Sequence, residues 1–227
     1  MLTNVPNSDI LLWLIDARKL ADDQLAHCIC WLNPEELARY RRFIRPQRQR
    51  QFLIGRCLLR AALSKLLKLA PTDISLTESA ANAPLLHCSP STPFFSISHS
   101  GPWVICAVSP HCVVGIDIEM KNPDRDLDAI AAHAFDETEV EQLSKLIGDE
   151  RLKYFYELWS HKEAYYKLLS NVDSNKDSNK DSKNKVESGG HCIALTHSEL
   201  SVVLCSQDVL RVPPVLVEVN FSTLISV

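Results

Sequence analysis

Two acidic side chains in a strand-like run are the residues whose type and spacing most clearly suggest chemistry. The run at 113–120, VVGIDIEM, combines strand-forming residues with one glycine, Asp117 and Glu119. Residues two apart in a strand project from the same face, about 6 to 7 Å apart, so the two carboxylates share a face with Gly115. The opposite face carries Val114, Ile116 and Ile118.

Burial of these carboxylates would require a compensating positive charge. Like charges side by side repel, and each buried charge is costly unless a positive group accompanies it. A divalent cation supplies that charge, and Mg²⁺ prefers carboxylate, phosphate and water oxygens. The pair therefore suggests a magnesium site, while the alternative is an exposed edge strand with two solvated acids.

A second group of reactive side chains lies in WSHKEAYYK, residues 159–167. Glu163 and Lys167 are four apart, so on a helix they are neighbours on one face, with Trp159 one turn before Glu163. An ordinary surface ion pair would explain them. The functional interpretation makes Glu163 a third carboxylate at the metal and Lys167 a cation beside a phosphate.

Basic residues are concentrated in one window. Residues 37–72 contain eight arginines and two lysines but no Asp or Glu, although the whole chain has a net charge of −4. Most of these arginines are interpreted as a solvated helix face, with Arg48, Arg56 and Arg60 projecting away from the core. Because the window lacks acid partners, a few of them are candidates for a compact anion site.

The elements that must position these residues follow from pattern and capping signals. The apolar run at 10–15 predicts a first strand, and Asn33 followed by Pro34 predicts a helix start, with Pro46 dividing the helix in two. FFSIS, WVICAVSP and HCVVGIDIEM predict an antiparallel meander. Helices are expected from Asp126 onward and strands in the last 37 residues, which gives an α+β chain.

Composition bounds the remaining possibilities. The chain has 227 residues with 46% hydrophobic content, enough for one large or two small domains. No apolar stretch approaches the roughly 20 residues that span a bilayer, and no export signal is recognised, so a cytoplasmic protein is expected. The eight cysteines form no CxxC pair, which favours buried thiols over disulfides or zinc. Residues 171–190 are polar and repetitive, and are expected to form a disordered loop without catalytic weight.

Together the two reactive segments resemble a known family. VGIDIE followed by WSHKEAYYK is similar to the paired motif of the 4′-phosphopantetheinyl transferases, G-(I/V)-D and W/F-(S/C/T)-x-K-E-(A/S)-x-x-K. FSISHSG, RYRRF and GRCLLR also agree, and the resemblance spans roughly residues 39–167. The chain length matches the longer, surfactin-synthetase-activating (Sfp-like) branch.

The resemblance implies a specific reaction and architecture. Such enzymes transfer the phosphopantetheine arm of coenzyme A, with Mg²⁺, to a serine of an acyl, peptidyl or aryl carrier protein and release adenosine 3′,5′-bisphosphate. The longer branch is a monomer of two similar α+β halves related by a pseudo-twofold axis. These halves would be residues 1–113 and 114–227.

The resemblance also implies roles for individual residues. Asp117, Glu119 and Glu163 would hold the metal, and either Glu163 or a metal-bound water would be the general base. Lys167 would neutralise the phosphate and assist the departing bisphosphate. Contacts to the 3′-phosphate of coenzyme A fall on Arg39, Ser98 and His99.

One departure from the family concerns the loop before SISHS. The family usually has Gly-Lys-Pro there, but this chain has Asn82, Ala83 and Pro84. Either an arginine replaces the missing lysine or the KM for coenzyme A is raised, a KM that Ala83→Lys would then lower. The candidate replacements are Arg45, Arg48 and Arg56.

Two alternative functions remain open. One is another Mg²⁺-dependent phosphotransferase, and the other is a nucleic-acid-binding module that uses the basic 37–72 helices. The second leaves both carboxylate motifs unexplained. From sequence, Asp117→Ala is expected to abolish transfer with the fold intact or stabilised, because it removes a like-charge repulsion.

Overall fold

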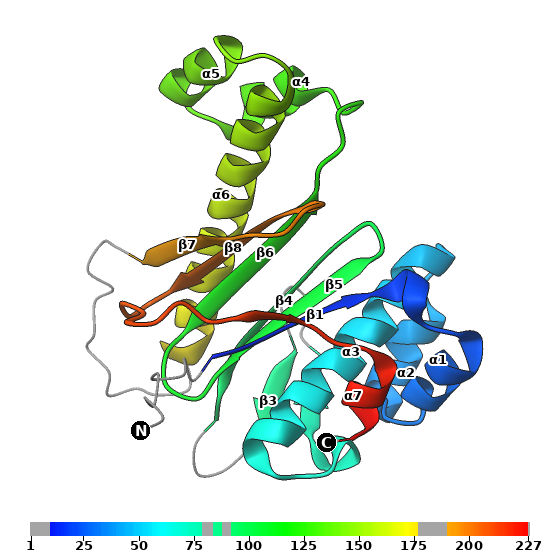
Figure 1. Ribbon diagram of the computed structural model, residues 1–227. Helices are drawn as coiled ribbons and strands as arrows, with labels where there is room; N and C mark the ends of the chain where they lie inside the picture. Colours follow the sequence, from blue (N-terminus) through cyan, green and yellow to red (C-terminus); the bar gives the residue numbers. More distant parts are fainter. Residues whose placement is uncertain (1–9, 79–83, 88–91, 177–189, 227) are drawn as a thin grey trace, which may run out of the picture.

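The computed structural model describes residues 10–78, 84–87, 92–176 and 190–226, with the side chains of 173–176 left out. It has the expected α+β composition (Figure 1). None of the described helices is both long enough and apolar enough to cross a membrane. Strands and 3₁₀ turns comprise β1 (Leu11–Asp16), η1 (Ala17–Lys19), η2 (Pro71–Asp73), β2 (Ser75–Thr77), β3 (Leu85–His87), β4 (Phe94–Ser100), β5 (Trp103–Ser109), β6 (Val114–Met120), β7 (His191–Leu195), β8 (Leu200–Ser206) and β9 (Leu216–Glu218). Helices comprise α1 (Asp22–Ile29), α2 (Pro34–Arg41), α3 (Pro46–Leu67), α4 (Leu127–Ala134), α5 (Glu137–Ser144), α6 (Gly148–Lys176) and α7 (Phe221–Ile225).

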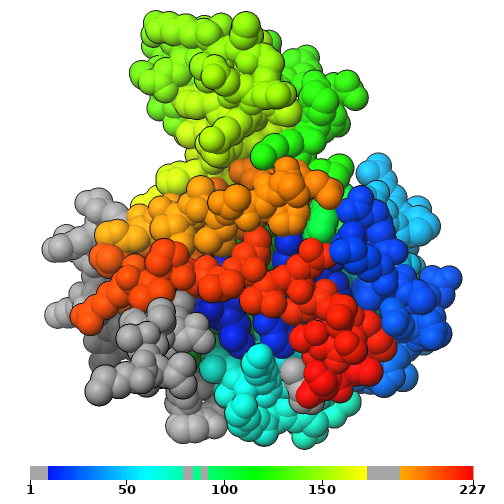
Figure 2. Space-filling view, in the orientation of Figure 1, coloured from blue at the N-terminus to red at the C-terminus, as the bar shows by residue number. Residues whose placement is uncertain are grey.

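Two sheets carry the fold, each with one long helix. The first has the strand order β4-β5-β1-β9 and packs one apolar face on α3 and the other against the second sheet. The second has the order β6-β8-β7, and α6 crosses one of its faces (Figure 1). Helices α4 and α5 gather at the far end of α6 and project beyond the body of the molecule (Figure 2).

The helix signals in the sequence are confirmed. The Asn33 side chain accepts a hydrogen bond from the Glu36 N–H, and Glu36 returns a bond to the Asn33 N–H, which closes a capping box before Pro34. Helix α3 begins at Pro46, as predicted. The prediction of a loop at 171–190 is wrong for 171–176, because α6 continues through Lys176. The remainder of that segment, 177–189, lies outside the described residues.

The predicted three-stranded meander is only half correct. Strands β4 and β5 form the expected antiparallel hairpin, whereas β6 pairs with β8 across the second sheet, with Asp117 opposite Val203. Residue pattern predicts a strand but not its partner, and β8 lies some 80 residues further along the chain. The strand that carries the two acids therefore begins a new sheet.

The C-terminal segment returns to the first sheet. Strand β9 pairs in parallel with β1, and Val219 and Leu224 join the core beneath α3. Figure 2 shows this segment, orange to red, crossing the face of the molecule toward the N-terminal helices. The sequence predicts strand for residues 212–227, but the described part of this segment contains the short β9 followed by α7, which Asn220 caps. By strand pairing, the last residues therefore belong with the first half of the chain.

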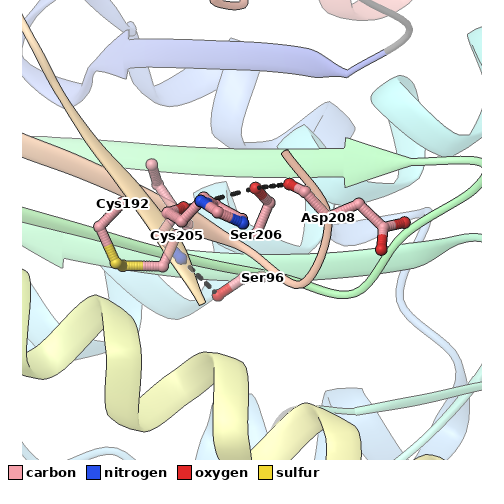
Figure 3. The surroundings of a disulfide bond; sticks show 7 residues. Ser96, Cys192, Cys205, Ser206 and Asp208 are labelled. Carbon is pink, nitrogen blue, oxygen red and sulfur yellow. Dashed lines mark hydrogen bonds between the residues drawn. A yellow bond between two sulfur atoms is a disulfide. The ribbon is translucent and has the colours of Figure 1, made fainter. Parts of the chain in front are cut away.

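One pair of cysteines contradicts the expectation of free thiols. Cys192 and Cys205 are paired residues of β7 and β8 and form a disulfide (Figure 3). Local spacing rules missed it because the register of two strands, not sequence proximity, brings the sulfur atoms together. The expectation holds for Cys28, Cys57, Cys106 and Cys112, which are buried and free.

Reduction of the Cys192–Cys205 disulfide is expected to lower the free energy of unfolding by about 2 to 3 kcal/mol. The bond closes a loop with a sequence separation of 13, and closure of a loop this short restricts the unfolded chain by about that much. Urea unfolding with and without a dithiol would measure the change. A Cys192→Ala/Cys205→Ala variant should not respond to the dithiol, and an equal response would contradict the assignment.

Candidate active site

The two faces of β6 differ as the sequence predicts. Val114, Ile116 and Ile118 are buried in the core between the sheets. On the other face Gly115 packs directly beneath α6, where an added Cβ would lie 2.1 Å from the Ala164 carbonyl oxygen and 2.5 Å from the Leu168 nitrogen. Glycine is therefore required here because any side chain would collide with the helix backbone.

Asp117 is almost completely buried, with 3% of its surface exposed. Its Oδ1 accepts hydrogen bonds from Lys167 Nζ at 2.7 Å and from Ser98 Oγ at 2.8 Å. Its Oδ2 is also buried and has no hydrogen-bond partner within the described part of the chain. The exposed-edge alternative is thus wrong for Asp117, and one of its oxygens is left available to a further group.

Glu119 lies beside Asp117 and is held through both carboxylate oxygens. Oε2 accepts a hydrogen bond from Ser100 Oγ at 2.8 Å, and Oε1 accepts one from Trp159 Nε1 at 3.1 Å. Burial raises the pKa of Glu119, and the negative charge of Asp117 adds to that rise. A nearby cation would relieve both effects.

Helix α6 lines up three residues against these carboxylates. Trp159 contacts Glu119, Lys167 contacts Asp117, and Glu163 lies one helical turn from each of them on the same row. The surface-pair alternative is wrong, because Lys167 pairs with Asp117 rather than with Glu163. The side chain of Glu163 makes neither a hydrogen bond nor an ion pair to any described residue.

The structure does not bring the three carboxylates into a ready metal cluster. Among the described residues, no three His, Cys, Asp or Glu side chains lie together in a way that could hold a metal ion. The residues nevertheless fit a cation in part. The buried, unpartnered Asp117 Oδ2 offers an oxygen ligand of the kind Mg²⁺ prefers.

A cavity of about 380 Å³ opens next to Lys167. We call it the basic cavity; its lining includes Arg39, Arg48, Arg56, His99, Tyr166 and Lys167, from α2, α3, β4 and α6. Its volume falls in the range of small-ligand sites. Lys167 thus lines the cavity and also contacts the carboxylate of Asp117.

The basic window has acid partners that lie just outside it. Glu36 pairs with Arg56 and Arg60, and Glu78 pairs with Arg39 and Arg56. The expectation that Arg56 and Arg60 project away from the core is wrong, because both are buried against these acids. Although burial opposes it, hydrogen bonds from Arg56 and Arg39 hold the pKa of Glu78 below its ordinary value.

Arg48 is the arginine that remains available at the cavity. It has no acid partner among the described residues, and its Nη1 lies 2.8 Å from His99 Nε2. Of the three arginines considered for the missing loop lysine, Arg45 does not line the cavity, and Arg56 is tied to two glutamates. Ala83 lies outside the described residues.

Ser98 and His99 point to opposite sides of β4. His99 faces the basic cavity, whereas the Ser98 hydroxyl contacts Asp117 and Lys167. Strand alternation in SISHS was the available signal for this separation. The same signal indicates that Ser100 shares the face of Ser98, and sequence reasoning missed its contact with Glu119.

His99 is expected to make stability fall between pH 6.5 and pH 4. Burial lowers its pKa from 6.5 to about 4, and Arg48 adds to this shift. Because only the unfolded chain takes up the proton in that interval, the contribution of His99 is complete above pH 6.5 and is lost as the pH falls toward 4. Urea midpoints at several pH values should drop less steeply for His99→Gln, and parallel pH profiles would contradict this.

The sequence of this chain matches those of known proteins. The profile of the 4′-phosphopantetheinyl transferase superfamily matches residues 113–195, and that of the 4′-phosphopantetheinyl transferase N-terminal region matches 19–111. The 4′-phosphopantetheinyl transferase HetI of Nostoc sp. is 32% identical over 163 residues, which cover 71% of this chain and 68% of HetI. The chain belongs to the 4′-phosphopantetheinyl transferase superfamily.

Further relatives support membership of this chain in the Sfp-like branch of the superfamily. Sfp of Bacillus subtilis is 36% identical over 152 residues, which cover 66% of this chain and 65% of Sfp. A putative 4′-phosphopantetheinyl transferase of Synechocystis sp. is 34% identical over 137 residues, which cover 60% of this chain and 56% of the relative. The matches to these two relatives thus span somewhat less than two thirds of their length.

Proposed function

We propose that this protein transfers the 4′-phosphopantetheine arm of coenzyme A to a serine hydroxyl of an acyl, peptidyl or aryl carrier protein, with Mg²⁺, and releases adenosine 3′,5′-bisphosphate. The observation that carries the proposal is Lys167, which lines the basic cavity and also donates to the buried Asp117. A phosphate group bound in that cavity would lie beside the carboxylates. Family membership supports the same reaction.

For the metal, Asp117, Glu119 and Glu163 are the proposed ligands. Asp117 Oδ2 has no other partner in the described chain, and Glu163 has no bond to lose on turning toward it. Bound Mg²⁺ would neutralise negative charge on the pyrophosphate of coenzyme A.

The remaining steps fall to side chains of α6. Lys167 Nζ would approach the phosphate that is attacked and stabilise charge on the departing bisphosphate, as a cation beside a transferring phosphoryl group does. Glu163 is the proposed general base for the serine proton, because its carboxylate is free of hydrogen bonds and ion pairs to described residues. Trp159, one turn earlier, keeps Glu119 in place.

Coenzyme A would bind in the basic cavity through Arg39, His99 and Lys167, with Ser98 holding Lys167 and Asp117 in place. Arg48 would replace the lysine that the family usually has at the position of Ala83. Residues 1–113 and 114–227 would form the two halves around this site in a cytoplasmic monomer, with β9 and α7 of the second half returning to the sheet of the first.

Arg48→Ala is expected to raise the KM for coenzyme A by about 10-fold or more, because a charge-assisted hydrogen bond contributes about 1.5 to 3 kcal/mol. Steady-state kinetics with varied coenzyme A would measure the change. Arg41→Ala removes an exposed arginine that is not part of the cavity lining and serves as the charge-matched control. Equal KM values for the two variants would assign the phosphate contact elsewhere.

Mass spectrometry of apo carrier proteins tests the proposed reaction. With coenzyme A, Mg²⁺ and this protein, the carrier should gain about 340 Da, the mass of the phosphopantetheine arm. No gain on several carriers would overturn the proposal. Another Mg²⁺-dependent phosphotransferase would then be indicated by turnover of a different phosphate donor, and a nucleic-acid-binding module by salt-dependent retention on DNA.

A further inference from the structure

Strands β4 and β6 belong to different sheets, yet serine side chains join them. The hydroxyls of Ser96, Ser98 and Ser100 accept hydrogen bonds from the backbone N–H groups twenty residues further on, at distances of 3.1, 3.4 and 2.9 Å. The donors are Ile116, Ile118 and Met120. We call the three serines the serine ladder. The constant offset means that the two strands run in parallel with a fixed register.

Side chains of helix α6 also join β4 to β6. Asn171 Nδ2 donates to the carbonyl oxygens of Phe95 in β4 and Val114 in β6, at 3.1 and 2.9 Å. Lys167 Nζ donates to the Ile116 carbonyl oxygen at 3.1 Å. Buried backbone groups of β6 that face β4 are therefore satisfied by side chains rather than by a neighbouring strand.

Two serines of the serine ladder also hold the carboxylates of Asp117 and Glu119. A hydroxyl has one hydrogen to donate and two lone pairs, so a serine that accepts a backbone N–H can still donate. Ser98 donates to Asp117, and Ser100 donates to Glu119, each the residue just before the N–H that it binds. Ser96 binds the N–H of Ile116, and the residue just before it is Gly115, which has no side chain.

We propose that Ser100 is a positioning residue, which acts through Glu119 to fix the carboxylate that holds the metal. Through its hydrogen bonds to the backbone of β6, the serine ladder also sets the register between the sheet that lines the basic cavity and the sheet that carries the two acids. This inference rests on the proposed function. Glu119 has two donors, Ser100 and Trp159, one on each oxygen, so the loss of either leaves the carboxylate free to rotate.

The chain offers a matched pair of variants. Ser96→Ala removes a hydrogen bond to the backbone of β6 and none to a carboxylate. Ser100→Ala removes the corresponding backbone hydrogen bond together with the hydrogen bond to Glu119. Mn²⁺ titrated alone and followed by electron paramagnetic resonance reports on the carboxylates without turnover. Ser100→Ala should weaken Mn²⁺ binding about tenfold more than Ser96→Ala, since loss of a hydrogen bond to a metal-binding side chain has an effect of that size.

Further variants separate positioning from stability. Ser100→Thr keeps the hydroxyl and should restore both Mn²⁺ affinity and kcat. Urea unfolding should show that Ser96→Ala also loses stability, although its Mn²⁺ affinity stays close to that of the wild type. Trp159→Phe removes the other donor to Glu119 and should also weaken Mn²⁺ binding, which keeps the test available if Ser100→Ala does not fold. Equal Mn²⁺ affinities for Ser96→Ala and Ser100→Ala would overturn the inference. Absence of carrier modification by the wild type would instead refute the proposed function.

Discussion

Asp117→Ala is expected to abolish phosphopantetheine transfer and also to destabilise the fold. In the proposed mechanism Asp117 holds the metal, and loss of such a carboxylate would remove several kcal/mol of transition-state stabilisation, which would lower kcat by about 100-fold or more. The sequence alone predicts an intact or more stable fold, because it shows only the repulsion between Asp117 and Glu119. The structure instead predicts a loss of stability. In the structure, Asp117 is the ion-pair partner of Lys167 at 2.7 Å, and its removal leaves a partly buried cation without that partner.

The stability loss should be about 1 to 3 kcal/mol, below the range for fully buried pairs because 27% of the Lys167 side chain is exposed. Carrier modification followed by mass spectrometry and urea unfolding measure the two effects. Asp117→Asn is the matched control: it keeps an oxygen that accepts from Ser98 and Lys167, so it should lose activity with a smaller loss of stability. Full activity in Asp117→Ala would show that Asp117 has no part in the mechanism.

Gly115→Ala is expected to destabilise the protein by about 3 kcal/mol, the upper end for overpacking of a tight core. The added methyl group would meet the backbone of α6 at Ala164 and Leu168, which cannot rotate away. Helix α6 would have to move, and it carries Glu163 and Lys167. A fall in kcat should therefore accompany the loss of stability, and urea unfolding together with carrier modification would show both.

Gly55→Ala provides the comparison for stability. A Cβ at Gly55 would meet its nearest neighbours at 3.7 and 3.8 Å, which is ordinary contact. Because alanine favours the interior of a helix by about 1 kcal/mol over glycine, this variant of α3 should be as stable as the wild type or more stable. A Gly115→Ala variant that unfolds at the same urea concentration as Gly55→Ala would show that α6 is not packed on Gly115.

Local chemistry made much of the fold predictable. Asn33 and Pro34 start α2, and Pro46 separates α3 from it, because capping and proline geometry depend on a few adjacent residues. Alternation in β6 correctly assigned its core face and its acidic face. The end of α6 was missed because the polar composition of 171–176 suggested a loop.

Charge balance was less predictable than secondary structure. The window 37–72 lacks acids in sequence, yet Glu36 and Glu78 lie against Arg56 in the fold. The basic cavity is therefore less positive than the count of arginines suggests. Sequence distance is a poor guide here, because an ion pair depends on where two elements meet.

By itself, the sequence determined the reactive residue types and their local geometry: two carboxylates on one face of a strand, and Trp159, Glu163 and Lys167 on one face of a helix. Only the tertiary structure decided what those faces meet. It placed α6 over β6 at Gly115, paired Lys167 with Asp117, and gave Glu119 its hydrogen bond from Ser100. The physical reason is range: periodicity and capping act over a few residues, whereas strand pairing, helix packing and ion pairs join segments that are far apart in the chain.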